Sequence, residues 1–345
     1  MQVLSVPESH HVYVRLLAEG LRRLGVGVRE APFPYLRWPR NFYRFVREVV
    51  RGSDMWQLHW NVFDFMAVAK LFLGARPPKT WTVHNLVPHQ QHFRDDLAVT
   101  ALYLDRVDVA VWHSQRSLDD AREALRRRGL PAKWSARDVV IPHMSFNGAF
   151  PDEVTGSQAR RSLGIPEEAF VVGHYAPTQA YKGTEDFLVA AAKTPQDGMV
   201  FCIFGECLDL GLRRKIESAA RSNPRLRLSL ERLADDQLQY WFKTCDLVVQ
   251  PYREITTSGS IFFPIAFRRP VVATPLGNIP DVIRHGVTGW LANSPADIVE
   301  RILEARSDPA RAEDIGQRAH DFVDRTANRD LVCRLYLEAY EKARV

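Results

Sequence analysis

Residues 245–291 read CDLVVQPYREITTSGSIFFPIAFRRPVVATPLGNIPDVIRHGVTGWL. Three short runs rich in apolar and β-branched residues, 246–252, 270–275 and 289–293, are separated by polar loops and by a helix-like segment at 261–268. Strands that alternate with helices form a parallel sheet that is covered on both faces. This stretch therefore predicts part of a doubly wound α/β domain.

The same alternation continues toward the N-terminus. In the second half, strands are expected at 170–175, 199–205 and 226–230, and helices at 185–192, 210–222 and 234–243. In the first half, strands are expected at 1–6, 55–60, 80–85, 108–114 and 138–143, and helices at 12–24, 63–73, 95–103 and 118–128. We expect an α/β protein with two Rossmann-like parallel-sheet domains that face a central cleft. The predicted division is 1–150, 151–328 and a C-terminal helix, 329–345, that packs back toward the first domain.

The composition supports this interpretation. The chain has 345 residues, of which 46% are hydrophobic and 25% charged, as in an ordinary globular protein of two domains. No apolar run approaches eighteen residues, so we expect neither a transmembrane helix nor a signal peptide. The four cysteines show no C-x-x-C spacing, which favours reduced thiols in a cytoplasmic protein over a zinc site.

The basic residues are concentrated in the first half. Residues 1–150 hold 21 Lys and Arg against 14 Asp and Glu, a net charge of +7, whereas residues 151–345 hold 25 against 27, a net charge of −2. We therefore expect the first half to meet an anionic or membrane-borne partner.

Two loops at neighbouring strand ends predict a phosphate site. Thr257–Ser260 is expected to cap the helix at 261–268, and its glycine allows the backbone to approach a ligand. Backbone N–H groups at such a helix start attract phosphate, although the pattern is also that of a plain helix cap. Gly277 and Asn278 lie in the next loop, and Lys182 opens a helix after the strand at 170–175, where it can pair with a diphosphate.

Histidines form a second pattern. One histidine lies at or near the end of each of five predicted strands: His59, His84, His113, His143 and His174. Ligands of doubly wound sheets bind at the carboxyl ends of the strands. These histidines are therefore candidates for ligand contact, His84 above all, although a histidine near a strand end is often only half-exposed and hydrogen bonded.

The motifs resemble those of the GT-B glycosyltransferases, within them the group 1 class that includes glycosyltransferase family 4. The similar segments are LGIPEE (163–168), YKG (181–183), FGE (204–206), the core at 245–291, and TVHNLVPH (82–89) in the first half. The resemblance covers nearly the whole chain.

The resemblance implies a hexosyltransferase. The second domain would bind a UDP- or GDP-linked sugar and the first an acceptor, a glycan or lipid-linked saccharide, in polysaccharide or glycoconjugate synthesis. The resemblance favours retention of configuration, because the leaving oxygen can take the acceptor proton. No cofactor is expected: the chain shows no D-x-D at a strand end suited to Mg²⁺, so helix dipole and cation would replace the metal.

The implied site residues fall into three groups. The predicted catalytic residues are His84, Glu254 and Lys182. The predicted donor-binding residues are Gln179, Gly205, Glu206, Tyr252, Thr257, Ser258, Gly259, Ser260, Gly277 and Asn278. The predicted acceptor-side residues are His10, His11, His59, Asn85 and His143.

The chain departs from the class in two places. Many members carry two glutamates eight residues apart around the sugar and the ribose, and those positions fall on Ile255 and Phe263. Neither side chain binds a hydroxyl, and Glu254 is the nearest replacement for the first. Many members also carry an arginine shortly before the lysine of YKG, whereas residues 176–180 read APTQA. These departures leave the donor sugar and the stereochemistry open.

Residues 35–51, YLRWPRNFYRFVREVVR, interleave five arginines with aromatic residues. A helix of this kind can lie on an anionic membrane, although it can equally pack Phe42, Phe45 and Val49 into the core. No nucleic-acid-binding motif is present, so we do not expect a nucleic-acid partner.

Two other functions compete with sugar transfer. A GT-B nucleotide-sugar 2-epimerase would need several carboxylates in the cleft, and the sequence offers few. A non-enzymatic two-domain sugar-binding protein would be expected to carry a secretion signal, and the sequence shows none.

Overall fold

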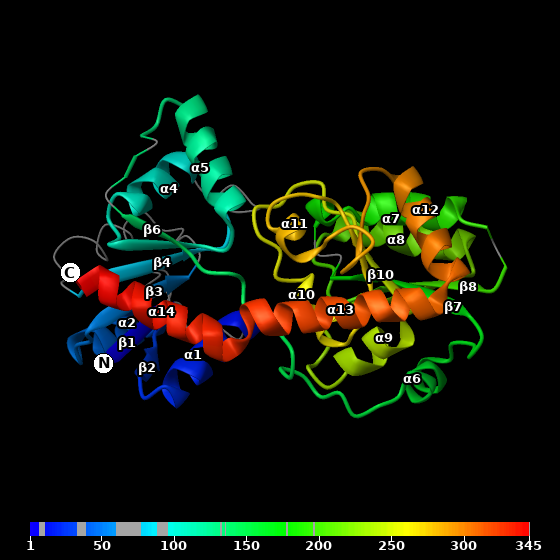
Figure 1. Ribbon diagram of the computed structural model, residues 1–345, viewed down its shortest axis with the longest axis horizontal. Helices are drawn as coiled ribbons and strands as arrows, with labels where there is room; N and C mark the ends of the chain where they lie inside the picture. Colours follow the sequence, from blue (N-terminus) through cyan, green and yellow to red (C-terminus); the bar gives the residue numbers. More distant parts are fainter. Residues whose placement is uncertain are drawn as a thin grey trace. The chain divides into compact units, whose positions relative to one another are not determined.

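A computed structural model describes residues 1–6, 11–32, 39–59, 77–87, 96–131, 133–134, 136–176, 179–195 and 197–344 (Figure 1). The chain divides into two compact units. Unit 1 comprises Met1–Met144 and Ala327–Val345, and unit 2 comprises Ser145–Thr326. The division therefore comes six residues before the boundary expected at 150, and the last helix is part of unit 1.

Unit 1 contains a six-stranded parallel sheet in the order β2-β1-β3-β4-β5-β6. Its strands are β1 (Gln2–Val6), β2 (Gly27–Glu30), β3 (Met55–His59), β4 (Lys79–Val83), β5 (Val109–Trp112) and β6 (Arg137–Val140). Its described helices are α1 (Val12–Arg23), α2 (Pro39–Val50), α4 (Asp96–Leu104), α5 (Gln115–Arg127) and α14 (Arg329–Arg344). The helix expected at 63–73 lies outside the described residues. The edge strand β2 was not predicted.

Helix α14 packs against α1 in the core of unit 1. A Cβ atom at Gly20 of α1 would lie 2.4 Å from the Cys333 Sγ atom of α14, so the absence of a side chain permits this close approach. The Tyr13 and Tyr336 hydroxyls are 2.9 Å apart, and Tyr336 also lies 2.7 Å from the Thr82 Oγ1 atom of β4. A buried hydrogen-bonded chain thus joins both helices to the sheet.

Unit 2 contains a second six-stranded parallel sheet, in the order β12-β11-β10-β7-β8-β9. Its strands are β7 (Phe170–Tyr175), β8 (Met199–Phe204), β9 (Leu226–Ser229), β10 (Leu247–Gln250), β11 (Val271–Ala273) and β12 (Trp290–Leu291). Its helices are α6 (Gly156–Leu163), the 3-10 turn η1 (Ala180–Lys182), α7 (Thr184–Lys193), α8 (Leu210–Ser222), α9 (Leu238–Thr244), α10 (Phe262–Ala266), α11 (Ile279–Val282), α12 (Pro295–Ser307) and α13 (Pro309–Ala327), whose last residue belongs to unit 1.

The two sheets confirm the predicted α/β class. Strands β7 and β8 are almost entirely buried because helices cover both faces of the sheet, which explains their continuous apolar sequence. The chain runs from β7 outward to β8 and β9, and then crosses to β10 on the other side of β7. Loops that follow two such neighbouring strands diverge and leave room for a ligand at the carboxyl edge. In unit 2 these are the loops after β7 and β10.

Across the part of the chain that the structure describes, no helix is both long and apolar enough to cross a bilayer.

Candidate functional site

The loops after β7 and β10 meet in unit 2. The Arg253 backbone N–H donates to the Tyr181 carbonyl at 2.8 Å. Gly183 has φ +72°, and a Cβ atom there would lie 1.7 Å from the Pro251 carbonyl oxygen. Only glycine combines this backbone conformation with this contact, so Gly183 fixes the approach of the two loops.

The Lys182 ammonium lies between these loops. Its Nζ atom donates to the Ser260 Oγ atom at 2.6 Å, and it lies 5.4 Å and 5.2 Å from the ring centres of Tyr181 and Tyr252. The side chain is only 7% exposed. Burial lowers its pKa from 10.5 to about 8, so the ammonium is still largely charged at pH 7.

Tyr252 links two serines of the loop after β10. The Ser258 hydroxyl donates to the Tyr252 oxygen at 2.7 Å, and the Tyr252 and Ser260 hydroxyls lie 2.9 Å apart. The hydroxyl groups of Ser258, Tyr252 and Ser260 carry three hydrogens but form only two hydrogen bonds with one another. The Lys182 ammonium donates one of its three hydrogens, to Ser260. One hydroxyl and two ammonium hydrogens therefore remain without an acceptor among the described residues, while Thr257 Oγ1 is also buried without a partner. This excess of donors around a cation suits an anion with several oxygens.

The loop after β11 contacts the loop after β10 and holds it in place. The Asn278 side-chain oxygen accepts from the Ser258 backbone N–H at 2.8 Å. Gly277 has φ +52°, and a Cβ atom there would lie 2.3 Å from the Thr256 carbonyl oxygen. Both predicted loops therefore come together, as their position at adjacent strand ends suggested.

The predicted helix cap is wrong. Helix α10 begins at Phe262 and has five residues rather than eight, and its N-cap, Ile261, has no side-chain hydrogen bond to the helix. The serine hydroxyls bond to Tyr252 and Lys182 instead, because these partners face them across the loop. The predicted anion site therefore rests on side-chain donors and not on a helix start.

The remaining predicted donor-binding residues make no side-chain hydrogen bond to this network within the described part of the chain. Gly205 follows β8 with φ +100°, and a Cβ atom there would lie 3.0 Å from the Ala176 backbone nitrogen. Gly259 and Gln179 are half-buried, and Glu206 and Glu254 are exposed. No contact of either glutamate with the Lys182 network is seen in the described structure.

His174 has a structural role. It lies within β7 and is fully buried, where Nδ1 donates to the Val249 carbonyl at 2.9 Å and Nε2 accepts from the Thr184 hydroxyl at 2.9 Å. Burial lowers its pKa to about 4, which keeps the ring neutral. It ties the start of α7 to β10 and thereby helps to position Lys182.

Unit 1 assembles the other four strand-end histidines. His59, His84, His113 and His143 form what we call the histidine row, with centres of successive rings 5.7, 5.2 and 4.9 Å apart. The Tyr13 ring of α1 contacts all four at 4.7 to 6.4 Å. Burial lowers the pKa of every member, to about 3 for His59 and about 4 for His113. The row is therefore a buried cluster of polar but uncharged rings at the carboxyl edge of the sheet.

The remaining acceptor-side predictions differ in position. His11 is exposed and caps α1, because its Nδ1 atom accepts from the Tyr13 backbone N–H at 3.2 Å. Asn85 is half-buried beside His84, and its Oδ1 atom has no hydrogen-bond partner within the described part of the chain. His10 lies outside the described residues. Tyr13 was missed, because its helical spacing alone marks it as an ordinary core residue.

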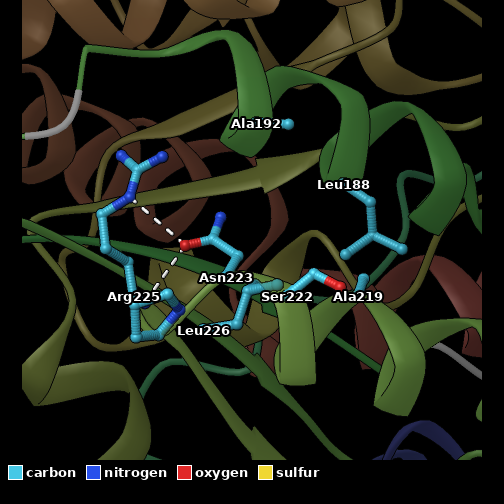
Figure 2. Close-up of a pocket in the computed structure, with 8 residues that line it drawn as sticks. Leu188, Ala192, Ala219, Ser222, Asn223, Arg225 and Leu226 are labelled. Atoms are coloured by element: carbon cyan, nitrogen blue, oxygen red, sulfur yellow. Dashed lines mark hydrogen bonds between the residues drawn. The ribbon is translucent and has the colours of Figure 1, made fainter.

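A pocket of 390 Å³ lies elsewhere in unit 2 (Figure 2). It is lined by the ends of α7 and α8 and by the start of β9, and so lies at the opposite edge of the sheet from Lys182. Its Arg225 side chain donates to the Ala191 carbonyl at 2.8 Å and to the Asn223 side chain at 3.4 Å. Arg225 thus caps the carboxyl end of α7. Because the pocket lies at the other edge of the sheet, it is separate from the Lys182 site.

Comparison with known proteins identifies a family and a fold. Residues 167–308, within unit 2, match the family model Glycosyl transferases group 1. The chain is 23% identical over 314 residues to a GDP-mannose:glycolipid 4-beta-D-mannosyltransferase of Xanthomonas campestris pv. campestris, a match covering 89% of this chain and 80% of that protein.

Solved structures show the same fold over the whole chain. Anabaena HepE in complex with UDP and glucose has a TM-score of 0.76 at 18% identity, covering 98% of both chains. The sucrose-phosphate synthase of Thermosynechococcus elongatus has a TM-score of 0.78 at 18% identity, covering 99% of this chain and 98% of that one. The two doubly wound units therefore define a GT-B fold. The match to group 1 lies in unit 2, the chain is a glycosyltransferase, and the resemblance inferred from its motifs is confirmed.

Proposed function

We propose that the protein transfers a sugar from a UDP- or GDP-linked donor to a hydroxyl of a glycan or lipid-linked saccharide, in polysaccharide or glycoconjugate synthesis. The observation that carries this proposal is the donor-rich network of Lys182, Ser258, Ser260 and Tyr252 at the switch point of unit 2. The HepE complex with UDP and the GDP-mannose named for the Xanthomonas relative support a nucleoside diphosphate donor.

The donor diphosphate would be held by side chains of unit 2. Lys182 and the Ser260 hydroxyl would donate to its oxygens, with Thr257, Gly259 and the rest of the loop close to it. Asn278 and Gly277 would hold this loop in place. Gly205 and Glu206 would lie toward the nucleotide, Glu254 toward the ribose or the sugar, and Gln179 beside the diphosphate.

Transfer breaks the bond between the sugar and the diphosphate oxygen and forms a bond to the acceptor oxygen. The departing diphosphate gains negative charge, which the Lys182 ammonium and the hydroxyl donors stabilise. We propose that this cation makes a metal ion unnecessary, so that EDTA leaves turnover unchanged. A loss of turnover with EDTA that Mg²⁺ restores would contradict this proposal.

We further propose retention of configuration. In that mechanism the acceptor proton passes to the leaving phosphate oxygen, so no strong base is required. Burial holds the pKa of His84 well below 6.5, which makes the imidazole a weak base and suits it to a hydrogen bond with the sugar. The NMR coupling constant of the anomeric proton in the product tests this step, and an inverted product would refute it.

Helix α2 supports a proposed contact with an anionic membrane surface, where a lipid-linked acceptor would reside. Of the predicted 35–51 segment, the structure describes 39–51. Phe45 is buried, whereas Tyr43 is 68% exposed beside an exposed basic stripe made of Arg40, Arg44, Arg47 and Arg51. Such a face fits anionic headgroups, although Glu48 pairs with Arg47 and Arg51 and reduces its charge. Sedimentation with phosphatidylglycerol vesicles, weakened in Arg40→Glu/Arg44→Glu, would support the contact. Equal sedimentation of both proteins would refute it.

The activity itself is tested with panels of UDP- and GDP-sugars, with and without a bacterial glycolipid extract. We expect release of nucleoside diphosphate and a glycosylated lipid detected by mass spectrometry. An isomerised sugar nucleotide without transfer would identify an epimerase. Binding without either product would identify a sugar-binding protein.

A further inference from the structure

His113 occupies the middle of the histidine row. Its ring lies between those of His84 and His143, at 5.2 and 4.9 Å, and 5.3 Å from that of Tyr13. The side chain comes from the carboxyl end of β5, and only 4% of the residue is exposed. None of the catalytic, donor or acceptor roles above uses it.

The hydrogen bond of His113 fixes its tautomer. The Nδ1 atom lies 3.1 Å from the Ile141 carbonyl oxygen, and a carbonyl only accepts. Nδ1 therefore carries the proton and donates it. Because burial keeps the ring neutral, Nε2 has a lone pair and no proton. This Nε2 atom is buried and has no hydrogen-bond partner among the described residues.

A buried acceptor without a partner is costly, and a ligand that donates to it removes the cost. The lone pair repels phosphate or carboxylate oxygens, and a cation would lose its hydration at this buried site without gaining a counter-charge, so the matching group is an uncharged donor. The rings in contact with His113 are neutral as well, and the Tyr13 hydroxyl is already hydrogen bonded to Tyr336. A sugar hydroxyl meets these requirements, because it carries a proton and no charge.

We propose that Nε2 of His113 accepts a hydrogen bond from a hydroxyl of the acceptor, so that the acceptor presents an uncharged sugar ring to the histidine row. This inference rests on the proposed transferase function. Any anionic part of the acceptor would then bind away from this row.

Two substitutions separate the ring nitrogens. His113→Asn keeps an amide N–H near the Nδ1 position, where it can still donate to Ile141, but removes the acceptor at Nε2. His113→Gln places an amide oxygen near the Nε2 position. His285→Asn, at an exposed histidine of unit 2, is the matched control. Melting temperatures establish that each variant folds.

The assay measures release of UDP or GDP from the donor as n-octyl glucoside, galactoside or mannoside is titrated, with the matching sugar 6-phosphates in parallel. We expect the uncharged glycosides to give saturable stimulation. His113→Asn should raise their KM about tenfold, His113→Gln should restore most of it, and His285→Asn should leave it unchanged. The calorimetric Kd for UDP or GDP should stay within twofold in all variants.

Imidazole ¹⁵N NMR gives a readout that a purely structural role would not move. The Nε2 signal that disappears in His113→Asn should have the chemical shift of an unprotonated nitrogen, and should move toward lower frequency with octyl glycoside.

Several results would overturn the proposal: a wild-type KM in His113→Asn, stimulation by the sugar phosphates alone, no stimulation by any uncharged glycoside, or stoichiometric Zn²⁺ uptake that requires His113. Each leaves the proposed function standing if the wild type still transfers sugar to a glycolipid. Failure of nucleotide binding and release in the wild type would instead refute the proposed function.

Discussion

Replacing Lys182 with methionine removes the buried ammonium and keeps most of the side-chain volume. Among the described residues, Lys182 is the cation of the network that includes Ser260 and Tyr252. A hydrogen bond to a charged group contributes about 1.5–3 kcal/mol, which corresponds to roughly 10- to 150-fold in an equilibrium or rate constant. The interaction strengthens as the diphosphate departs, so we expect kcat/KM for the donor to fall about 100-fold.

The same substitution should not destabilise the protein. Burial lowers the Lys182 pKa from 10.5 to about 8, so at pH 7 the charged form costs the folded state about 3 kcal/mol relative to the unfolded chain. Methionine relieves this cost and loses one hydrogen bond to Ser260. The variant should therefore melt at or above the wild-type temperature, and its lost activity cannot be attributed to unfolding.

The experiment compares initial rates of nucleotide release with melting temperatures for Lys182→Met and Lys193→Met. Lys193 is exposed at the end of α7, the helix that follows Lys182, so its substitution should leave both quantities unchanged. A Lys182→Met enzyme within threefold of wild-type kcat/KM would refute the assignment of the donor site.

Because Lys182 must be charged to bind the donor and its pKa is about 8, kcat/KM should be constant below pH 8 and fall above it. A pH–rate profile of Lys182→Met with the same inflection would contradict this. Gly183→Ala should lower the melting temperature of unit 2 by several degrees more than Gly164→Ala. Both glycines have positive φ, but only at Gly183 would a Cβ atom collide with Pro251. Equal losses would show that the loop moves to accommodate the methyl group. The folded-state pKa of His174 is about 4, below its unfolded value, so its contribution to stability is complete above pH 6.5 and falls by about 2 kcal/mol at pH 5. Between pH 7.5 and 5, the free energy of unfolding in urea should therefore fall by about 2 kcal/mol more for the wild type than for His174→Gln. An equal pH dependence of the two proteins would contradict this.

The sequence allowed most of the sheet to be predicted, because buried parallel strands carry their own signal. Strand β7 was found with its bounds, since its apolar run stands between polar segments. Strand β2 was missed because GVRE is short, lies at the sheet edge and is only partly buried. An edge strand of this composition has no periodicity long enough to separate it from a loop.

The structure brings several of the predicted site residues together, but their hydrogen bonds could not be predicted from the sequence. Serine and glycine after a strand indicated a phosphate loop, and Lys182 was identified from its position. Whether the Ser258 hydroxyl caps a helix or bonds to Tyr252 depends on the fold of the loop, which local sequence does not determine. Tyr13 likewise contacts histidines from four strands, a relation that only the assembled sheet creates.

Hydrogen exchange with and without UDP or GDP tests the location of the donor site most directly. Bound nucleotide should slow amide exchange in residues 179–183, 252–260 and 276–279, and should leave exchange in residues 219–226 around the opposite pocket unchanged. Absence of protection in 252–260, or protection confined to 219–226, would contradict it.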